Sequence, residues 1–338
     1  MSTHPLCPVL LLRLSALGDI VHTWPLAEAL GRGQRFRIAW LVEERFVPLV
    51  ALHPAVATAI PVASKRWRKA PTSSATWGEV RAALAAIRTF APELALDPQG
   101  LVKSACWAAL AGVPRRVGFA AACRRERIPG IFYTETVQPP QELAHVVDLN
   151  LALAQHLGVE VTFGAYPDAS FLRPHLPPAP TEAKSVLLLP ASGNPVKNWP
   201  PEAFAALARK LLAKGLPVTV LWGPGEQKVA QAVVEAAPGA YLAPPTNLMQ
   251  LAAFLANAIA VVGADTGPVQ LAAAFGTPTV AVHLVTDPRR NAPRGPRVAI
   301  ASGAKTGTRR HSAATGPQRP VPVEEVSMRL ERLLAANV

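Results

Sequence analysis

The stretch from Val9 to Leu30 constrains the fold of this chain more than any other. It opens with an apolar run, VLLLRL, which predicts a buried strand, and the small residues SALG then break the pattern. Gly18 allows a tight turn that a ligand can approach closely, and Asp19 stands where a helix should start. A strand, such a turn and a helix open many nucleotide-binding domains. Asp19 is therefore either the cap of this helix or an acidic group offered to a ligand.

The rest of the first half alternates between strand and helix patterns. The alternation predicts a doubly wound parallel sheet. Strands are expected at 37–42, 59–62 and 94–96, and helices at 44–52, at 77–90, after the DPQG turn as far as residue 111, and at 145–157. The polar, basic segment 64–76 is expected to be a loop.

The second half restarts the same pattern after a proline-rich stretch. Strands are expected at 186–189, 218–222, 260–263 and 278–283, and helices at 201–212, 228–237, 248–257, 269–275 and 323–336, with a loop at 298–321. We therefore predict an α/β protein with two Rossmann-like domains that face each other across a cleft. The expected parts are a first domain at 1–173, a linker at 174–184, a second domain at 185–321 and a terminal helix at 322–338 that packs back on the first domain.

Composition narrows the partners and the compartment. The chain has 338 residues, of which 34 are Lys or Arg and 22 are Asp or Glu, so its net charge is +12. Such a balance favours anionic partners, although a composition bias towards arginine explains it equally well. Three cysteines without CxxC spacing indicate a reducing compartment rather than disulfides or zinc. Without a signal peptide or an apolar run that could span a bilayer, the sequence predicts a cytoplasmic protein.

The segment 260–282, AVVGADTGPVQLAAAFGTPTVAV, is the strongest local signal for a ligand site. A strand runs directly into Asp265, Thr266 and Gly267, and Pro268 then suits the first turn of a helix. The free amides and the positive dipole end of a helix start form an anion site that suits a nucleotide diphosphate. The alternative is a tight turn without a ligand. Neither half carries GxGxxG, which disfavours a dinucleotide oxidoreductase.

Several of these motifs together resemble one family. LSALGDIVHTWP at 14–25, DPQGLVKS at 97–104, DTG at 265–267 and TDPRRNAPRGP at 286–296 are similar to motifs of the lipopolysaccharide heptosyltransferases, glycosyltransferase family 9, of the heptosyltransferase I type. The resemblance covers about residues 9–296 and implies the GT-B fold. It implies an inverting enzyme that transfers heptose from ADP-heptose to a lipopolysaccharide inner-core acceptor of the Kdo-lipid A type. Asp19 matches the proposed catalytic base of the family.

The resemblance also assigns donor-binding residues in the second half. Lys197 matches a lysine that contacts the donor phosphate, Glu226 matches an acidic residue that holds the ribose, and the donor motif covers Asp265, Thr266 and Gly267. Gln270 stands where the family usually has a histidine, and glutamine cannot become a cation. Ser192 is expected to add a donor nearby. No metal ion or cofactor is expected, because Lys197 and the helix amides would carry the diphosphate charge.

Acceptor binding is expected in the first half. The residues assigned to it are Gly18, Gln99, Lys103, Arg124 and Arg125. The last two belong to a run of five arginines between Arg115 and Arg127, and arginine binds carboxylate and phosphate in a bidentate manner. Arg127 replaces the proline of the family's R-E-P segment. The basic segment 65–69 is expected to help hold an acidic glycolipid at the inner-membrane surface.

Three alternatives stay open at this point. Another sugar-nucleotide enzyme of the same fold is compatible with Gln270, and a non-catalytic nucleotide-binding paralogue is compatible with every motif. The basic runs could also be solvated loops without a ligand. Nucleic acid is not expected as a partner, because only Trp67 among the aromatic residues lies between basic side chains.

Overall fold

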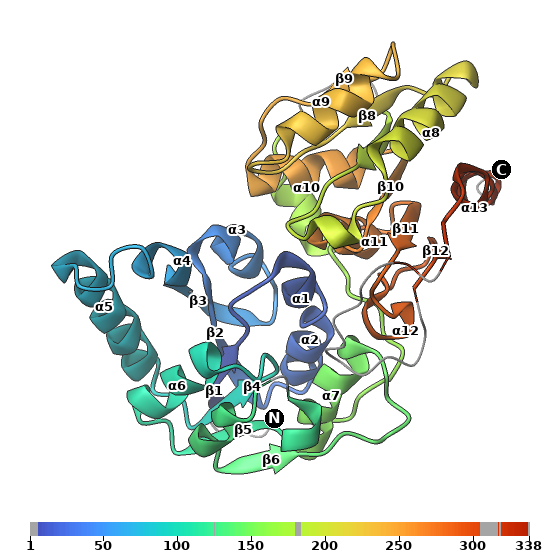
Figure 1. The fold of residues 1–338 in the computed structure, drawn as a ribbon. Coiled ribbons are helices and arrows are strands. Elements are labelled where there is room, and N and C mark those ends of the chain that lie inside the picture. The colour runs from blue at the N-terminus through green and yellow to red at the C-terminus, as the bar shows by residue number, and fades with distance from the viewer. Residues whose placement is uncertain (1–5, 125, 180–183, 305–316, 318, 337–338) are drawn as a thin grey trace. The chain divides into compact units, whose positions relative to one another are not determined.

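The computed structural model describes residues 6–336 apart from 125, 180–183, 305–316 and 318. The chain divides into two compact units, Met1–Ala165 and Tyr166–Val338. Each unit contains a six-stranded parallel sheet with helices on both faces (Figure 1). The expected α/β architecture with two Rossmann-like sheets is therefore confirmed.

The sheet of the first unit has the strand order β3-β2-β1-β4-β5-β6. Its strands are β1 (Cys7–Leu12), β2 (Phe36–Glu43), β3 (Val56–Val62), β4 (Leu94–Asp97), β5 (Arg115–Phe119) and β6 (Glu135–Val137). Its helices are α1 (Leu17–Val21), α2 (Trp24–Arg32), α3 (Val47–Val50), α4 (Ser64–Trp67), α5 (Ser74–Phe90), α6 (Val102–Ala111) and α7 (Val146–His156). β1 lies in the middle of the sheet, and Val9 to Leu12 are completely or almost completely buried, as the opening apolar run predicts.

Two groups of helices cover the two faces of this sheet. Apolar side chains of α5 and α6, among them Ile87 and Trp107, share one core with Leu10, Leu12 and Leu41. On the other face, α2 and α7 pack against each other, and α7 also contacts β5 and β6. The strand order places the carboxyl ends of β1 and β4 side by side, so the turns that follow them meet at one edge.

The sheet of the second unit has the order β12-β11-β10-β7-β8-β9. Its strands are β7 (Val186–Leu189), β8 (Val218–Val220), β9 (Tyr241–Leu242), β10 (Ala260–Ala264), β11 (Thr279–His283) and β12 (Val298–Ser302). Its helices are α8 (Pro201–Ala213), α9 (Gln227–Glu235), α10 (Leu248–Asn257), α11 (Gly267–Ala274), α12 (Pro288–Asn291) and α13 (Val323–Ala335). The core on one face contains side chains of α8, α9 and α13, whereas α10 and α11 pack against each other outside that core.

The structure departs from the expected elements at several segments. β9 and α12 were not expected, and the expected helix at 44–52 is a 3-10 turn at Glu44–Phe46 followed by α3. β12 occupies the start of the expected loop 298–321, because its residues pair in parallel with β11, and most of the remainder of that loop lies outside the described residues. A short helix, α4, forms inside the expected loop 64–76. The arginine-rich stretch contributes β5, whose neighbour β6 completes the first sheet.

The division between the two units falls between Ala165 and Tyr166, ahead of the expected linker. The 3-10 helix Ser170–His175 buries Leu172, and the Ala169 amide donates to the carbonyl of Ala274, so the chain from 166 onwards packs in the second unit. The expected linker at 174–184 is described except for 180–183. The terminal helix α13 buries Val326 and Leu330 against β11, β12 and α8, so its apolar face belongs to the core of the second unit. That this helix also packs back on the first domain stays a prediction.

Candidate active site

The turn after β1 holds Asp19 in a fixed local geometry. The helix α1 begins at Leu17 with Ala16 at its cap position, so Asp19 lies in the third helical position. Asp19 is thus not the N-cap residue itself, but its side chain caps the helix from the third position, as in a capping box. The Asp19 carboxylate reaches back and accepts a hydrogen bond from the Ala16 amide at 3.1 Å. The residue is half-buried, and a carboxylate oxygen can accept more than one hydrogen bond.

A buried arginine supports the helix that carries Asp19. The Arg13 guanidinium is 5% exposed and donates to the hydroxyl of Thr23 and to the carbonyl of Pro98. The Thr23 hydroxyl donates in turn to the backbone carbonyl of Asp19 at 2.7 Å. Burial lowers the pKa of Arg13 from its ordinary value. Arg13 could not be recognised as a supporting residue from the sequence, because an arginine within an apolar run resembles an interruption of the strand.

The segment after β4 supplies two of the residues expected to bind an acceptor, Gln99 and Lys103. Gln99 accepts a hydrogen bond from the Leu14 amide at 2.7 Å, and the Lys103 ammonium donates to the Ser15 hydroxyl at 3.1 Å. Both contacts join this segment to the residues just before Gly18 and Asp19. Desolvation holds the pKa of Lys103 below its ordinary value. Gln99, Lys103, Gly18 and Asp19 thus form one group at the carboxyl ends of β1 and β4.

The buried carboxylate of Asp97 fixes the turn after β4 through four hydrogen bonds. It is 1% exposed and accepts from the amides of Gln99 and Gly100 at 2.9 and 3.0 Å. Its other oxygen accepts from the hydroxyls of Ser104 and Tyr133 at 3.0 and 2.7 Å. Burial raises the pKa of Asp97, while these hydrogen bonds counteract the rise. Asp97 therefore fixes the backbone that carries Gln99, and it is not itself offered to solvent.

Arg124 lies beside the same turn. Its guanidinium carbon lies 5.4 Å from the ring centroid of Tyr133, and its Nη2 donates to the carbonyl of Arg127. Its Nε and Nη1 are buried and have no hydrogen-bond partner among the described residues. A Cβ on Gly100 would lie 3.6 Å from Cγ of Arg124, so the arginine packs directly against the Asp97–Gly100 turn. Arg125 lies outside the described residues.

The second unit gathers a different set of side chains where β10 ends. Asp265, which follows β10, is 9% exposed and forms an ion pair with Lys197 at 2.8 Å. Its carboxylate also accepts from the Thr286 hydroxyl at 2.9 Å, and Gln270 Nε2 lies 3.5 Å from its other oxygen. Burial alone would raise the pKa of Asp265. The charges of His283 and Lys197 and the two hydrogen bonds outweigh burial and hold that pKa below its ordinary value.

The start of α11 lies directly beside this cluster. Thr266 is the cap residue and Gly267 is the first helical residue, and the first amides of a helix lack partners within it. The Thr266 hydroxyl is buried and has no hydrogen-bond partner within the described part of the chain. Gln270 is buried and donates to the carbonyl of Asn291 at 2.7 Å, so it joins α11 to α12. The side of α11 that begins at Thr266 can therefore receive an anion.

Ser192 and Glu226 each form hydrogen bonds within the loop that carries them. The Ser192 hydroxyl donates to the side-chain oxygen of Asn198 at 2.6 Å, which closes the loop that carries Lys197. Glu226 is the cap residue of α9 and accepts from the Gly223 amide at 2.9 Å. Glu226 follows β8, two strands away from β10 at the same edge of the sheet, and is not in the direct cluster of Lys197, Asp265 and Gln270.

Sequence reasoning assigned no role to His283 or to Thr286, although Thr286 opens the motif at 286–296. Asp265 and Thr286 follow β10 and β11, which pair in parallel, so their side chains meet at one edge. Both strands were expected, at 260–263 and 278–283, but the sequence does not show that they are neighbours in the sheet, and the meeting of the two side chains depends on that pairing.

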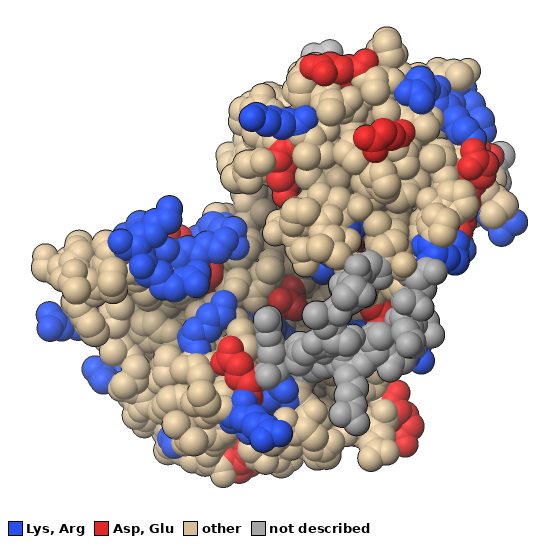
Figure 2. Space-filling model, viewed as in Figure 1, with Lys and Arg blue, Asp and Glu red and all other residues tan. Residues whose placement is uncertain are grey.

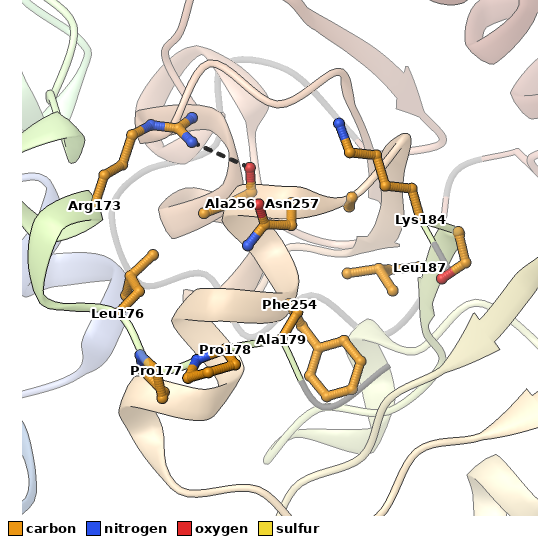
Figure 3. A pocket seen from close by; sticks show the side chains of 12 residues that line it. Arg173, Leu176, Pro177, Pro178, Ala179, Lys184, Leu187, Phe254, Ala256 and Asn257 are labelled. Carbon is orange, nitrogen blue, oxygen red and sulfur yellow. Dashed lines mark hydrogen bonds between the residues drawn. The ribbon is translucent and has the colours of Figure 1, made fainter. Parts of the chain in front are cut away.

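A cavity of about 660 Å³ in the second unit lies away from this cluster (Figure 3). Its lining includes Ser185 and Ala258, which precede β7 and β10, whereas Asp265 follows β10. Arg173 extends along one wall and donates to the carbonyl of Ala256 at 3.3 Å. The cavity therefore lies at the opposite edge of the sheet from the candidate donor site.

Comparison with known proteins identifies the family. The model of glycosyltransferase family 9, described as heptosyltransferase, matches residues 80–316. The chain belongs to glycosyltransferase family 9. Lipopolysaccharide heptosyltransferase 1 of Escherichia coli K12 is 32% identical over 285 residues, which cover 83% of this chain and 88% of that protein. The protein of the same name from Pseudomonas aeruginosa is 32% identical over 83% of this chain and 79% of its own length.

Solved structures of heptosyltransferases agree with this family assignment. The structure described as E. coli heptosyltransferase WaaC with ADP has a TM-score of 0.79 at 28% identity, and the match covers 96% of this chain and 99% of that one. The same enzyme with ADP-2-deoxy-2-fluoro heptose has a TM-score of 0.77 at 28% identity, with the same coverage of both chains. The family 9 resemblance that the motifs indicated is confirmed, as is the prediction that the chain is a glycosyltransferase.

Proposed function

We propose that this glycosyltransferase transfers heptose from ADP-heptose to a lipopolysaccharide inner-core acceptor of the Kdo-lipid A type, with inversion at the anomeric carbon. The observation that carries this proposal is the ion pair of Lys197 with Asp265 beside the first turn of α11. It is supported by the relatives named lipopolysaccharide heptosyltransferase 1 and by the related structure with a fluorinated ADP-heptose.

Lys197 and the start of α11 hold the diphosphate. The lysine ammonium has three N–H donors, and Asp265 accepts one of them, so two donors are left for phosphate oxygens. The amides of Gly267 and Val269 at the helix start add donors and a positive dipole end. As ADP leaves, negative charge grows on its diphosphate, and these groups stabilise it. They do so without a metal ion or cofactor, and Glu226 accepts hydrogen bonds from the ribose hydroxyls.

Asp19 is the general base for the acceptor hydroxyl. A carboxylate oxygen takes the proton while the hydroxyl oxygen attacks the anomeric carbon, and the bond to ADP breaks on the opposite side of the sugar. The contact from the Ala16 amide orients the carboxylate. Lys103 and Arg124, with Gly18, Gln99 and Arg125, bind the anionic acceptor near this base.

The acceptor implies contact with the cytoplasmic surface of the inner membrane. Lysine and arginine side chains gather over α4 (Figure 2), where Lys65, Arg66, Arg68 and Lys69 are all exposed. Arg66 is paired with Glu44 and Glu79, and the other three have no ion pair among the described residues. No helix in the described part of the chain is long and apolar enough to cross a bilayer.

A vesicle experiment tests the membrane contact. Each of the three unpaired cations near an anionic surface contributes about 1 kcal/mol, so replacing all three with alanine should weaken binding to phosphatidylglycerol vesicles about 100-fold. Binding to neutral vesicles should be weak for both proteins. Equal binding of the variant and the unaltered protein to the anionic vesicles would contradict this surface.

One assay tests the transfer reaction and its alternatives. The protein is incubated with ADP-heptose and a Kdo-bearing lipid A acceptor, and ADP release is measured, with UDP- and GDP-sugars in parallel. We expect ADP release only when both the ADP-heptose and the acceptor are present. Turnover of a different sugar nucleotide would favour another enzyme of this fold, and ADP binding without turnover would favour a non-catalytic paralogue.

A further inference from the structure

Four polar side chains in the second unit are joined end to end. His283 Nδ1 lies 3.1 Å from the Thr286 hydroxyl, and that hydroxyl lies 2.9 Å from Oδ2 of Asp265. The same Oδ2 lies 2.8 Å from the ammonium of Lys197. His283 is completely buried at the end of β11, whereas the Lys197 side chain is 26% exposed. The row therefore leads from the core to the surface of the donor site.

The direction of each hydrogen bond follows from the chemistry of the groups. Asp265 is ionised, because its pKa lies below the ordinary value, and so it only accepts. The single proton of the Thr286 hydroxyl therefore goes to Asp265, and the hydroxyl oxygen accepts from His283. The Thr286 carbonyl, 3.3 Å from the same Nδ1, can also only accept. Both neighbours of His283 Nδ1 can therefore only accept from it, so Nδ1 carries a proton and donates. Burial lowers the pKa of His283 from its ordinary value.

We propose that His283 is a positioning residue for the nucleoside diphosphate: its Nδ1–H fixes the Thr286 hydroxyl, which orients Asp265 and, through it, the Lys197 ammonium. The inference rests on the proposed function, in which Lys197 contacts the diphosphate. A lysine has a long side chain whose rotamer freedom must be lost when it binds a ligand. A preformed contact with an oriented carboxylate reduces that loss and so strengthens binding.

Of the two ring nitrogens of His283, only Nδ1 faces the Thr286 hydroxyl. Nε2 is buried and has no hydrogen-bond partner among the described residues. The ring therefore acts through Nδ1. An asparagine at 283 can place its side-chain N–H close to the position of Nδ1, whereas a leucine of similar volume provides no donor. The pair His283→Asn and His283→Leu thus separates the hydrogen bond from the filling of the core.

The experiment compares nucleotide affinities by calorimetry. We expect His283→Leu to weaken ADP binding about tenfold, the net size of one hydrogen bond, and to leave adenosine binding unchanged. His283→Asn should restore most of the ADP affinity. Lys197→Met should weaken ADP binding by itself. Adding His283→Leu to it should have no further effect, because the ammonium that His283 helps to position is then absent.

A second measurement does not depend on nucleotide binding. The rate at which Lys197 is acetylated by a small reagent, followed by mass spectrometry, should rise in His283→Leu and stay near the original rate in His283→Asn. Thermal unfolding shows whether each variant is folded. Equal Lys197 reactivity in all three folded proteins would overturn the inference, as would a parallel loss of ADP and adenosine affinity. Normal ADP affinity in Lys197→Met would contradict the proposed donor site, whereas the reactivity result would still decide the role of His283.

Discussion

At the scale of single residues, the candidate site depends on buried polar groups that fix accessible ones. Asp97 and Arg13 are both buried, and neither is placed to meet a ligand, yet they set the positions of Gln99 and of the helix with Asp19. Asp265 does the same for Lys197. Buried charges of this kind are costly to leave unpaired, so changes to them should affect stability before they affect chemistry.

Removal of the Asp97 carboxylate should strongly destabilise the protein. Asp97→Ala leaves two amides and two hydroxyls without their acceptor, and we expect a loss of about 3–5 kcal/mol in the free energy of unfolding. Asp97→Asn keeps one acceptor oxygen for the two amides and should lose much less. Urea unfolding measures both. A loss below about 1 kcal/mol in the alanine variant would show that this network is not structurally important.

A surface carboxylate of the first unit gives a pH-dependent prediction. Glu135 accepts from Arg115 at 2.7 and 2.9 Å and lies 3.1 Å from His156, and these contacts lower the pKa of Glu135 to about 2. The lowered pKa stabilises the folded state above the ordinary value of 4.5, and this contribution is lost as the pH falls towards 2.

The variant Glu135→Gln tests whether the stabilisation by Glu135 is lost as the pH falls. The unaltered protein should be the more stable of the two near pH 5, and the difference should shrink steadily as urea unfolding is repeated towards pH 3. Solvent screening limits the size of the difference, because both partners are partly exposed. A difference that grows as the pH falls would contradict the assignment.

At the scale of elements, the donor site requires β7, β10 and α11 to approach closely. Gly263 in β10 has no side chain, and a Cβ there would lie 2.8 Å from both Leu189 Cβ and Val269 Cγ2. Both contacts are closer than real Cβ atoms allow, so a larger residue would push α11 away from the sheet. Such a shift would move the amides of the first turn of α11.

Gly263→Ala should therefore destabilise the protein by about 1–3 kcal/mol and weaken ADP binding. Gly78→Ala is the matched control, because a Cβ at Gly78 in α5 meets no atom within 4 Å. In a helix interior this exchange should stabilise by about 0.5–1 kcal/mol and leave ADP affinity unchanged. Thermal unfolding and calorimetry report the two effects. Equal behaviour of the two variants would show that the close approach at Gly263 is unimportant.

The elements that the sequence predicted well are those with strong local signals. Asn247 at the cap and the apolar period after it predicted α10 at its observed bounds, 248–257. β5 and β6 were not predicted, because Arg115 and Arg116 mask the strand pattern and β6 has only three residues. β12 was hidden in a stretch of small residues, and its pairing with β11 decides its conformation.

The candidate active site, like the secondary structure, was predicted in part. Lys197, Asp265 and Gln270 meet as the resemblance implied, and Asp19, Gln99 and Lys103 gather at one edge of the first sheet. The roles of His283, Thr286 and Arg13 were not predicted, because they depend on contacts between strands that are distant in the sequence. The assignment of each residue to donor, acceptor or proton transfer stays a prediction.

At the scale of the whole molecule, the chain divides the proposed reaction between two compact units, each with its own core. The first unit carries the proposed base and acceptor residues, and the second carries the proposed donor residues. We therefore expect changes at the proposed base in the first unit to slow heptose transfer and leave ADP binding intact, whereas changes at the proposed donor residues of the second unit should weaken ADP binding and, with it, transfer. That Asp19 and the turn at 265–267 act on the same pair of substrates is the central claim.

The most direct test measures ADP affinity and heptose transfer in the same two variants, Asp19→Asn and Lys197→Met. We predict that Asp19→Asn binds ADP as tightly as the unaltered protein but transfers heptose at least about 100-fold more slowly, the usual contribution of a general base. Lys197→Met should lose ADP affinity as well as transfer. Normal heptose transfer by Asp19→Asn would contradict the account, because no other group in it takes the proton of the acceptor.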